Sequence, residues 1–495
     1  MRTKITLYNT IVSLISQFIF LVLSIIFPRL IILTFGSEVN GLTASINQIL
    51  NIINLLQAGI VGASIYDMYK PISENDKEMV GKIYYSAKMY FNKLSLIFFM
   101  FGIIVIPIFL INSNNDISFI ETFLSVIILT LNGALIFRYI SSYDIIISAH
   151  QRKYILVYSS LIEKLIYYFL LVIVLYTRVH FIFMYVSLIC GTLLRIVYLS
   201  HYFNKHYLND IKRYSSKTNY KVKNQFYLLA NQIVQQIIES GPTLIITTFY
   251  GLATVSVFSL YNMIVSAFKM IFTTIQNSIA PSFGDLSVSN KNQSSIIFDV
   301  LQLLFVNLGE IVTSCLIVLC IPFIQLYSNG FSDVNYINTK LAFCISFLCL
   351  SYCIFMPYNM AINANGQYRS VTKQNIVYGI LFSILGVILS IFDYTYCIIC
   401  FSLFYVVSSF DRIYIIKNKC FSLNKKKHFR RIIFAVIYPV IYYIVFSKIE
   451  ISTLVEFLLF GFLHFVISSL IILIMDFIFD RDTFRYIYKL IRSKL

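Results

Sequence analysis

Long apolar runs follow one another from end to end of this chain. Many contain about 18 or more residues almost free of charge, enough for a helix to cross a hydrocarbon core of about 30 Å. In lipid the backbone finds no water, so each run must satisfy its own hydrogen bonds as a helix. Only 12% of the residues are charged, about half the usual share of soluble domains. The sequence therefore predicts an all-α integral membrane protein.

Hydropathy predicts fourteen transmembrane helices, twelve of them in two sets of six. The first set occupies approximately 6–34, 42–65, 83–111, 119–147, 155–176 and 181–200, and the second approximately 225–249, 253–282, 296–323, 338–362, 374–391 and 396–416. Two extra C-terminal helices occupy approximately 432–447 and 453–478. We expect an N-terminal six-helix bundle (1–203), a basic linker (204–224), a C-terminal six-helix bundle (225–416), a second basic linker (417–431), the extra helices (432–478) and an amphipathic tail (479–495).

One short stretch occurs twice. Residues 28–35 read PRLIILTF and residues 242–249 read PTLIITTF, so six of eight positions recur after 214 residues. Asn47 likewise has Asn262 as its counterpart 215 residues on. Because an even number of spans separates the copies, the two bundles would be related by a pseudo-twofold along the membrane normal. Internal repeats of this kind are typical of transporters whose site lies between the halves.

The positive charge is concentrated in alternate loops. A net charge of +17 would suit nucleic-acid binding, but the basic residues gather in every second loop, above all in 205–223 and 417–431. The positive-inside rule then puts both termini in the cytoplasm and excludes nucleic acid as the partner. The sequence has no phosphate-binding loop and no catalytic triad or paired carboxylates, so we expect neither an enzyme nor a cofactor. The Cys397 and Cys400 pair is expected to be apolar packing, not a metal site.

Polar side chains line one face of several predicted helices. In lipid such a face must meet other helices or water. Interhelical hydrogen bonding alone would explain any single amide, whereas faces that recur on duplicated helices favour a shared cavity. The candidate residues of this cavity are Asn47, Asn51 and Asn54 in the second span, Gln232 and Gln235 in the seventh, and Asn262 and Ser266 in the eighth.

Ionisable residues near mid-span are the stronger candidates. A charge there costs about 2.5–3.5 kcal/mol, so it needs a partner, water or a function. Simple ion pairing is one explanation, and a residue near a span end can instead reach the headgroups. If the cations converge, they form a surface suited to a phosphate or diphosphate; they are Arg29, Arg138, Lys164 and Lys269. Candidates for binding a coupling ion, H+ or Na+, are Glu163, Glu239 and Glu310.

The chain resembles the Wzx-type polysaccharide repeat-unit flippases of the multidrug/oligosaccharidyl-lipid/polysaccharide exporter superfamily. The likeness rests on the first span ending in Pro28-Arg29-Leu30, on the Gly36 to Gly41 loop, on the amide-rich second span and on the Ala149-x-Gln151-x-Lys153 turn. It covers essentially the whole chain. The resemblance implies two six-helix bundles that open alternately to each side of a bacterial plasma membrane, with Arg29 and Lys269 as the positions nearest to the expected cationic cavity residues.

The resemblance also implies the cargo: an undecaprenyl-diphosphate-linked oligosaccharide moved to the outer leaflet for capsule, exopolysaccharide or O-antigen assembly. Expected partners are anionic membrane lipids, which the basic tail would meet, and a polysaccharide polymerase and glycosyltransferases. Alternatives are a flippase for lipid II or a teichoic-acid precursor, and a cation-coupled drug antiporter of the same superfamily. A membrane polymerase or glycosyltransferase is disfavoured because the predicted outer loops are short.

Overall fold

The computed structural model describes residues 2–111, 117–150, 152–207, 225–446 and 451–492, with the side chains of most of them. Within these ranges every regular element is a helix, and twelve helices are long and apolar enough to cross a membrane. The all-helical membrane class is therefore confirmed. Most of the predicted linker 204–224 lies outside the described residues. The count of fourteen spans, the two-bundle arrangement and the domain boundaries stay predictions.

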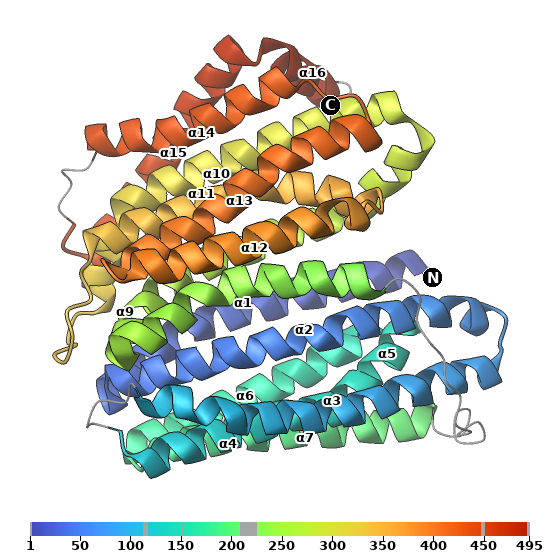
Figure 1. Ribbon diagram of the computed structural model, residues 1–495, viewed down its shortest axis with the longest axis vertical. Helices are drawn as coiled ribbons and strands as arrows, with labels where there is room; N and C mark the ends of the chain where they lie inside the picture. The colour runs from blue at the N-terminus through green and yellow to red at the C-terminus, as the bar shows by residue number, and fades with distance from the viewer. Residues whose placement is uncertain (1, 112–116, 151, 208–224, 447–450, 493–495) are drawn as a thin grey trace. The chain divides into compact units, whose positions relative to one another are not determined.

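The chain forms two compact units, Met1–Gln236 with Ile246–Ser256 (unit 1) and Ile237–Ile245 with Val257–Leu495 (unit 2). In unit 1, α3 packs on α2 and α4, α6 packs on α1 and α7, and α4 also packs on α7 (Figure 1). Its helices are α1 (Arg2–Phe35), α2 (Ser37–Ser73), α3 (Lys77–Ile111), α4 (Phe119–Leu135), the π-helix η1 (Ile136–Ile140), α5 (Ser141–Ala149), α6 (Lys153–Thr177), α7 (Ile182–His206) and part of α9 (Gln225–Ser289).

In unit 2, α11 and α13 pack closely on each other, and α10 joins α11 to the C-terminal helices α14 and α15. The basic run before the predicted thirteenth span is helical: α14 starts at Lys425, so only a short connection separates it from α13. Besides the rest of α9, this unit holds α10 (Lys291–Tyr327), α11 (Thr339–Ala364), α12 (Tyr368–Ser390), α13 (Tyr394–Lys419), α14 (Lys425–Phe446), α15 (Leu454–Phe479) and α16 (Arg481–Arg492).

The repeated stretch ends at the same kind of turn in both copies. Gly36 has a φ of 87° between α1 and α2, and Gly251 has a φ of 81° and a ψ of 173° inside α9. Residues with a side chain rarely adopt these angles, so glycine lets the chain reverse without a loop. The predicted seventh and eighth spans are thus the two halves of α9, which meet at Gly251.

Within unit 1 the two turns contact each other. The Asn40 amide donates to Ser256 Oγ at 2.8 Å, and the hydroxyls of Ser45 and Thr247 are 2.7 Å apart. A Cβ at Gly41 would lie 1.8 Å from the carbonyl oxygen of Leu252, so a side chain cannot fit there. The duplicated segments therefore pair through small polar residues, as membrane helices commonly do.

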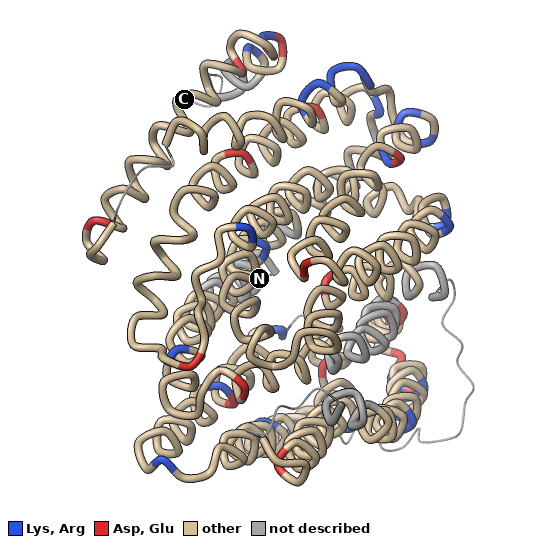
Figure 2. Tube along the Cα trace, turned by 60° about the vertical axis from the view of Figure 1, so that its left-hand side comes forward, with Lys and Arg blue, Asp and Glu red and all other residues tan. Residues whose placement is uncertain are grey.

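The exposed surface of the described helices is largely apolar. On α15, Leu458, Phe462 and Ile474 are 61%, 71% and 59% exposed. Figure 2 shows that most of the charged residues lie toward helix ends, with uncharged residues along the helix middles. An apolar outer surface of this extent suits lipid, not water.

Candidate functional site

Lys269 lies on α9 in unit 2, where its ammonium group sits above two tyrosine rings. Its Nζ atom is 4.8 Å from the ring centre of Tyr352 on α11 and 5.8 Å from that of Tyr405 on α13. The negative face of an aromatic ring attracts a cation at this range, by about 0.5–2 kcal/mol. Lys269 is half-buried, and among the described residues no carboxylate lies within ion-pair distance of it.

The two tyrosines form a fixed platform. Their rings meet edge to face with centres 5.5 Å apart, and Phe355 on α11 adds a third ring 5.2 Å from Tyr405. Tyr352 is 5% exposed and Tyr405 is fully buried. Edge-to-face packing of this kind favours one geometry, so the platform holds the Lys269 ammonium in place without neutralising it.

Glu239, on the segment of α9 that belongs to unit 2, lies near the same platform. Its carboxyl is close enough to both Tyr352 and Tyr405 for its charge to act on their hydroxyls. Two of the predicted ionisable residues, Lys269 and Glu239, are thus brought to one pair of tyrosines. The tyrosines themselves escaped sequence reasoning because aromatic residues are common throughout this chain.

Arg412 on α13 is a buried cation that sequence reasoning missed. It is 2% exposed, and its guanidinium lies 4.3 Å from the ring centre of Phe355. It donates to the Ser408 carbonyl at 3.0 Å and to the side-chain oxygen of Asn375 at 3.1 Å. Within the described part of the chain no carboxylate accepts from Arg412, and its Nε has no partner. Arg412 lies near the inner end of a predicted span, where charged residues are common, so the sequence did not single it out.

In unit 1, Glu163 is ion-paired. Its carboxylate accepts from Arg195 Nη1 at 2.7 Å and from the Thr192 hydroxyl at 3.0 Å. Both charged groups are largely buried, at 8% and 17% exposure of the side chains. This ion pair joins α6 to α7. Simple ion pairing was one of the explanations that the sequence left open for Glu163. Arg195 was not predicted, since its partner lies on another helix.

The other predicted cations of unit 1 are not gathered at one point by any described contact. Arg138 is exposed within the π-helix, 5.7 Å from the Tyr139 ring centre. Lys164 is half-buried and lacks a hydrogen bond to any described residue, and Arg29 is half-buried and interacts with other residues. Their convergence on a phosphate stays a prediction.

The predicted amides and serine differ in burial. Asn47, Asn51 and Ser266 are exposed, Asn262 is half-buried, and the side chain of Asn54 lies outside the described residues. Gln232 and Gln235 are half-buried. The buried Oε1 of Gln232 has no hydrogen-bond partner among the described atoms. Such an atom needs water or a ligand, so Gln232 stays a candidate.

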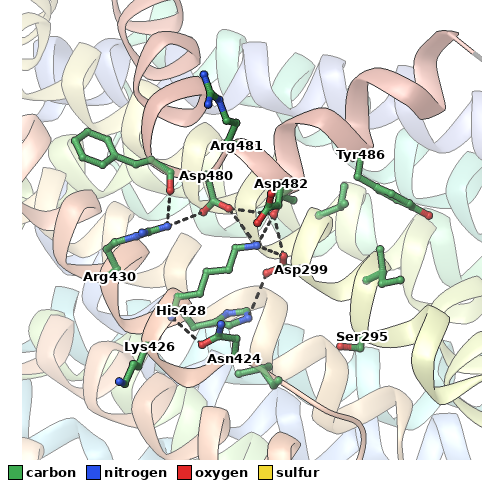
Figure 3. Close-up of a pocket in the computed structure, with 16 residues that line it drawn as sticks. Ser295, Asp299, Asn424, Lys426, His428, Arg430, Asp480, Arg481, Asp482 and Tyr486 are labelled. Atoms are coloured by element: carbon green, nitrogen blue, oxygen red, sulfur yellow. Dashed lines mark hydrogen bonds and ion pairs between the residues drawn. The ribbon is translucent and has the colours of Figure 1, made fainter.

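A charged pocket lies at the N-terminal end of α14, bordered by α10 and α16 (Figure 3). Arg431 Nε donates to Asp480 at 2.6 Å, and Arg431 Nη1 donates to Asp299 at 2.9 Å. Lys427 pairs with the same two carboxylates. The pocket, of about 780 Å³, reaches the surface at Lys426 and Arg481. This cluster joins the tail helix α16 to α10 and α14 through Thr483, which donates to Asp299 and accepts from Arg431.

In the described ranges no group of three or more His, Cys, Asp or Glu residues is placed to hold a metal ion. The feature of this region that suits an anionic ligand is the Lys269 ammonium held on aromatic rings.

No family profile and no curated protein sequence matches the chain. Several solved structures are similar, among them the following two. An inward-facing multidrug resistance MATE family transporter of the MOP superfamily gives a TM-score of 0.63 at 11% identity, covering 88% of this chain and 98% of that one. The lipid II flippase MurJ, in an inward closed conformation, gives a TM-score of 0.63 at 16% identity, covering 96% and 99%. The chain therefore has the fold of these transporters along nearly its whole length.

Proposed function

We propose that this chain is a flippase for a lipid-linked oligosaccharide. It moves an undecaprenyl-diphosphate-linked repeat unit from the cytoplasmic to the outer leaflet by alternating access, and it leaves the covalent structure of its cargo unchanged. The product would serve capsule, exopolysaccharide or O-antigen assembly. The observation that carries the proposal is Lys269, a half-buried ammonium held above two tyrosines and paired with no described carboxylate.

An amphiphilic anion fits this arrangement. A diphosphate brings negative charge into the membrane region, where it needs a cation that is not already neutralised. Lys269 supplies one on a flexible stem, and a compact ammonium binds phosphate oxygens from many directions. The similarity in fold to a lipid II flippase supports a lipid-linked cargo.

The proposal includes an orientation. Both termini face the cytoplasm of a bacterial plasma membrane, supported by the basic residues at the start of α14. The tail helix α16 then lies near the anionic inner leaflet. Glycosyltransferases would act on the lipid-linked sugar before its transfer, and a polymerase would act on it afterwards.

Two alternatives have specific support. The MurJ-like fold favours lipid II or a teichoic-acid precursor as the cargo, and the MATE-like fold favours a cation-coupled drug antiporter. The charge at the tyrosine platform separates these cases. The positive charge of Lys269 suits an anionic cargo. A drug cation would bind there only if the negative charge of Glu239 outweighed the charge of Lys269.

Reconstitution tests the proposal. The full chain is inserted into vesicles that hold a labelled undecaprenyl-diphosphate oligosaccharide on one side, and a membrane-impermeant glycosidase reports the label that reaches the other side. We expect transfer by the wild type, slower transfer by Lys269→Ala, and wild-type transfer by Lys153→Ala, whose side chain is exposed at the start of α6. Transfer of lipid II or of a drug cation in preference to the oligosaccharide would replace the proposed cargo.

A further inference from the structure

Carboxyl groups from two different helices border the same small cavity of unit 2. Glu310 on α10 and Asp476 on α15 both line a cavity of about 40 Å³, together with Asn307, Arg430 and Arg431. This volume has room for about three water molecules. Glu310 and Asp476 are close enough for their charges to interact.

Glu310 has no partner that would hold it ionised. It is 8% exposed, and none of the described residues donates a hydrogen bond to its carboxyl or pairs with it. Asp476 differs, because the Asn307 amide donates to its Oδ2 at 2.5 Å. A buried carboxyl without a hydrogen-bond donor is stable only if it carries a proton or shares one.

We infer that Glu310 and Asp476 form a proton-binding site that couples proton movement to transport. One proton is shared by the two carboxyl groups. It is taken from water in the cavity, forms an O–H bond to a Glu310 carboxyl oxygen, and returns to water when that bond breaks. This inference rests on the proposed transport function, and it assigns the coupling ion to a site on α10 and α15.

The charges around the cavity favour a proton over a metal cation. From α14, Arg430, Arg431 and Tyr438 face it, and from α15 it is bordered by Asp476 and by Asp480 at the helix end. A sodium ion would need several oxygen ligands and would meet two guanidinium groups in the same small space. A proton needs only one carboxyl oxygen and a water molecule. Because Arg431 is itself held by Asp299 and Asp480, it is not available to neutralise Glu310.

The cavity lies next to the charged pocket of Figure 3, which would be its route to water. Arg430, Phe479 and Asp480 line both spaces, and the larger pocket extends to the surface at Lys426. With the proposed orientation, the site would exchange protons with the cytoplasm.

Polar groups continue from the cavity along the interface of α14 and α15. Tyr438 lies 3.1 Å from the Ser468 hydroxyl, and Tyr442 lies 2.7 Å from Nδ1 of His464. His464, Ser468 and Asp476 fall on one face of α15, at spacings of four and eight residues. The buried Nε2 of His464 has no hydrogen-bond partner among the described atoms. This row of polar side chains would form a path for a proton away from Glu310.

The test uses the full chain in vesicles with an imposed pH gradient. For one proton per cargo, a gradient of one pH unit should accelerate wild-type transfer by up to about tenfold. Glu310→Gln should abolish this response, and Asp476→Asn should weaken it. Glu456→Gln is the matched control: it makes the same carboxyl-to-amide change on a half-buried side chain at the other end of α15, where glutamine can still accept the capping hydrogen bond from Thr453 N–H, and it should keep the response. A gradient response preserved in Glu310→Gln, or a response only to a sodium gradient, would overturn the inference.

A second readout separates this inference from the proposed function. Infrared spectra of the purified protein at neutral pH should show a protonated-carboxyl band that is missing in Glu310→Gln and present in Glu456→Gln. Suppose that neither the wild type nor any variant moves the oligosaccharide, but the band is missing only in Glu310→Gln. The proposed cargo is then wrong and the proton site is supported. If transfer occurs and the band is the same in all three proteins, the proton site fails alone.

Discussion

Single cations in unit 2 are held in unlike ways, and this difference separates binding from structural roles. Lys269 rests on tyrosine rings and keeps its charge available, while Arg412 gives its hydrogens to neutral acceptors on α11, α12 and α13. Arg431 is neutralised by two carboxylates. We therefore propose cargo binding for Lys269, and a stabilising role for Arg412 and Arg431.

Removal of the Lys269 charge should weaken binding of the diphosphate lipid. A hydrogen bond to a charged group contributes about 1.5–3 kcal/mol, so Lys269→Ala should raise the Kd about 10-fold to 100-fold. Lys269→Arg keeps the charge and should stay within about tenfold of the wild type. Titration of the purified protein with a fluorescent undecaprenyl-diphosphate lipid measures both. Equal Kd values for wild type and Lys269→Ala would remove this residue from the binding site.

Replacement of Arg412 should lower stability even when the charge is kept. Lysine cannot donate in several fixed directions at once, so Arg412→Lys leaves buried acceptors without donors, at about 1–3 kcal/mol each. We expect a lower thermal unfolding midpoint in detergent than for Arg369→Lys, an exposed arginine at the start of α12. Equal midpoints for the two variants would show that the Arg412 hydrogen bonds do not stabilise the fold.

The sequence analysis selected several charged residues within apolar runs, but it missed most of the residues that lie beside them. Lys269, Glu239 and Glu310 were recognisable because a charge in an apolar run is rare and costly. Arg412, Arg195 and Asp476 were missed. Arg412 and Asp476 lie near span ends, where a charge is expected, and the ion pair of Arg195 is visible only once α6 and α7 are brought together. Glu163, by contrast, was recognised and belongs to that structural ion pair.

At the scale of elements, two helix junctions depend on glycine and one helix depends on a charge cluster. The junctions at Gly36 and Gly251 follow the two copies of the repeated stretch, and both have positive φ angles. The docking of α16 could not be predicted, since Asp299, Arg431 and Asp480 are far apart in sequence and meet only through packing.

Substitution at Gly251 should destabilise the fold. A side chain in this conformation costs about 1–3 kcal/mol, so Gly251→Ala should lower the thermal midpoint. Gly36→Ala should do the same, because the two turns share their geometry. The control is Gly284→Ala, where a new Cβ would meet only atoms 3.8 Å or more away. A midpoint for Gly251→Ala equal to that of Gly284→Ala would contradict the strain argument.

Loss of Arg431 should release the tail helix. Without it Asp299 and Asp480 lose their main partner, and an uncompensated buried charge costs about 3–5 kcal/mol. Arg431→Met should therefore make α16 more sensitive to trypsin than Lys426→Met, which removes an exposed lysine of the same helix. Unchanged cleavage rates at α16 would mean that this cluster does not hold the helix.

Acid should weaken the same cluster. Burial alone would raise the pKa of Asp480, but Arg431 and Lys427 outweigh it and hold the pKa below its usual value. A lowered pKa in the folded state stabilises the structure at pH values above about 4 and loses this effect as the pH falls through the folded-state pKa. Pepsin cleavage at α16 should thus increase below about pH 4, and less so in Asp480→Asn. Equal acid dependence of the two proteins would contradict this assignment.

At the scale of the whole molecule, the all-helical membrane class was accessible from sequence and the cargo was not. Apolar runs predict a helical membrane protein, and the fold shared with a MATE transporter and with MurJ agrees with that. Those two proteins share a fold, although one is a multidrug resistance transporter and the other a lipid II flippase. The fold alone therefore does not fix the cargo, and for this chain we propose the tyrosine platform as the place where it is bound.

The most direct test of the account follows the cargo from one side of a membrane to the other and examines its covalent structure. Vesicles with the full chain and a labelled undecaprenyl-diphosphate oligosaccharide are sampled over time, with a membrane-impermeant glycosidase outside and mass analysis of the uncleaved glycan. We expect the label to become accessible outside while the glycan keeps its mass. Label that stays inside, or a glycan that grows or shortens, would contradict it.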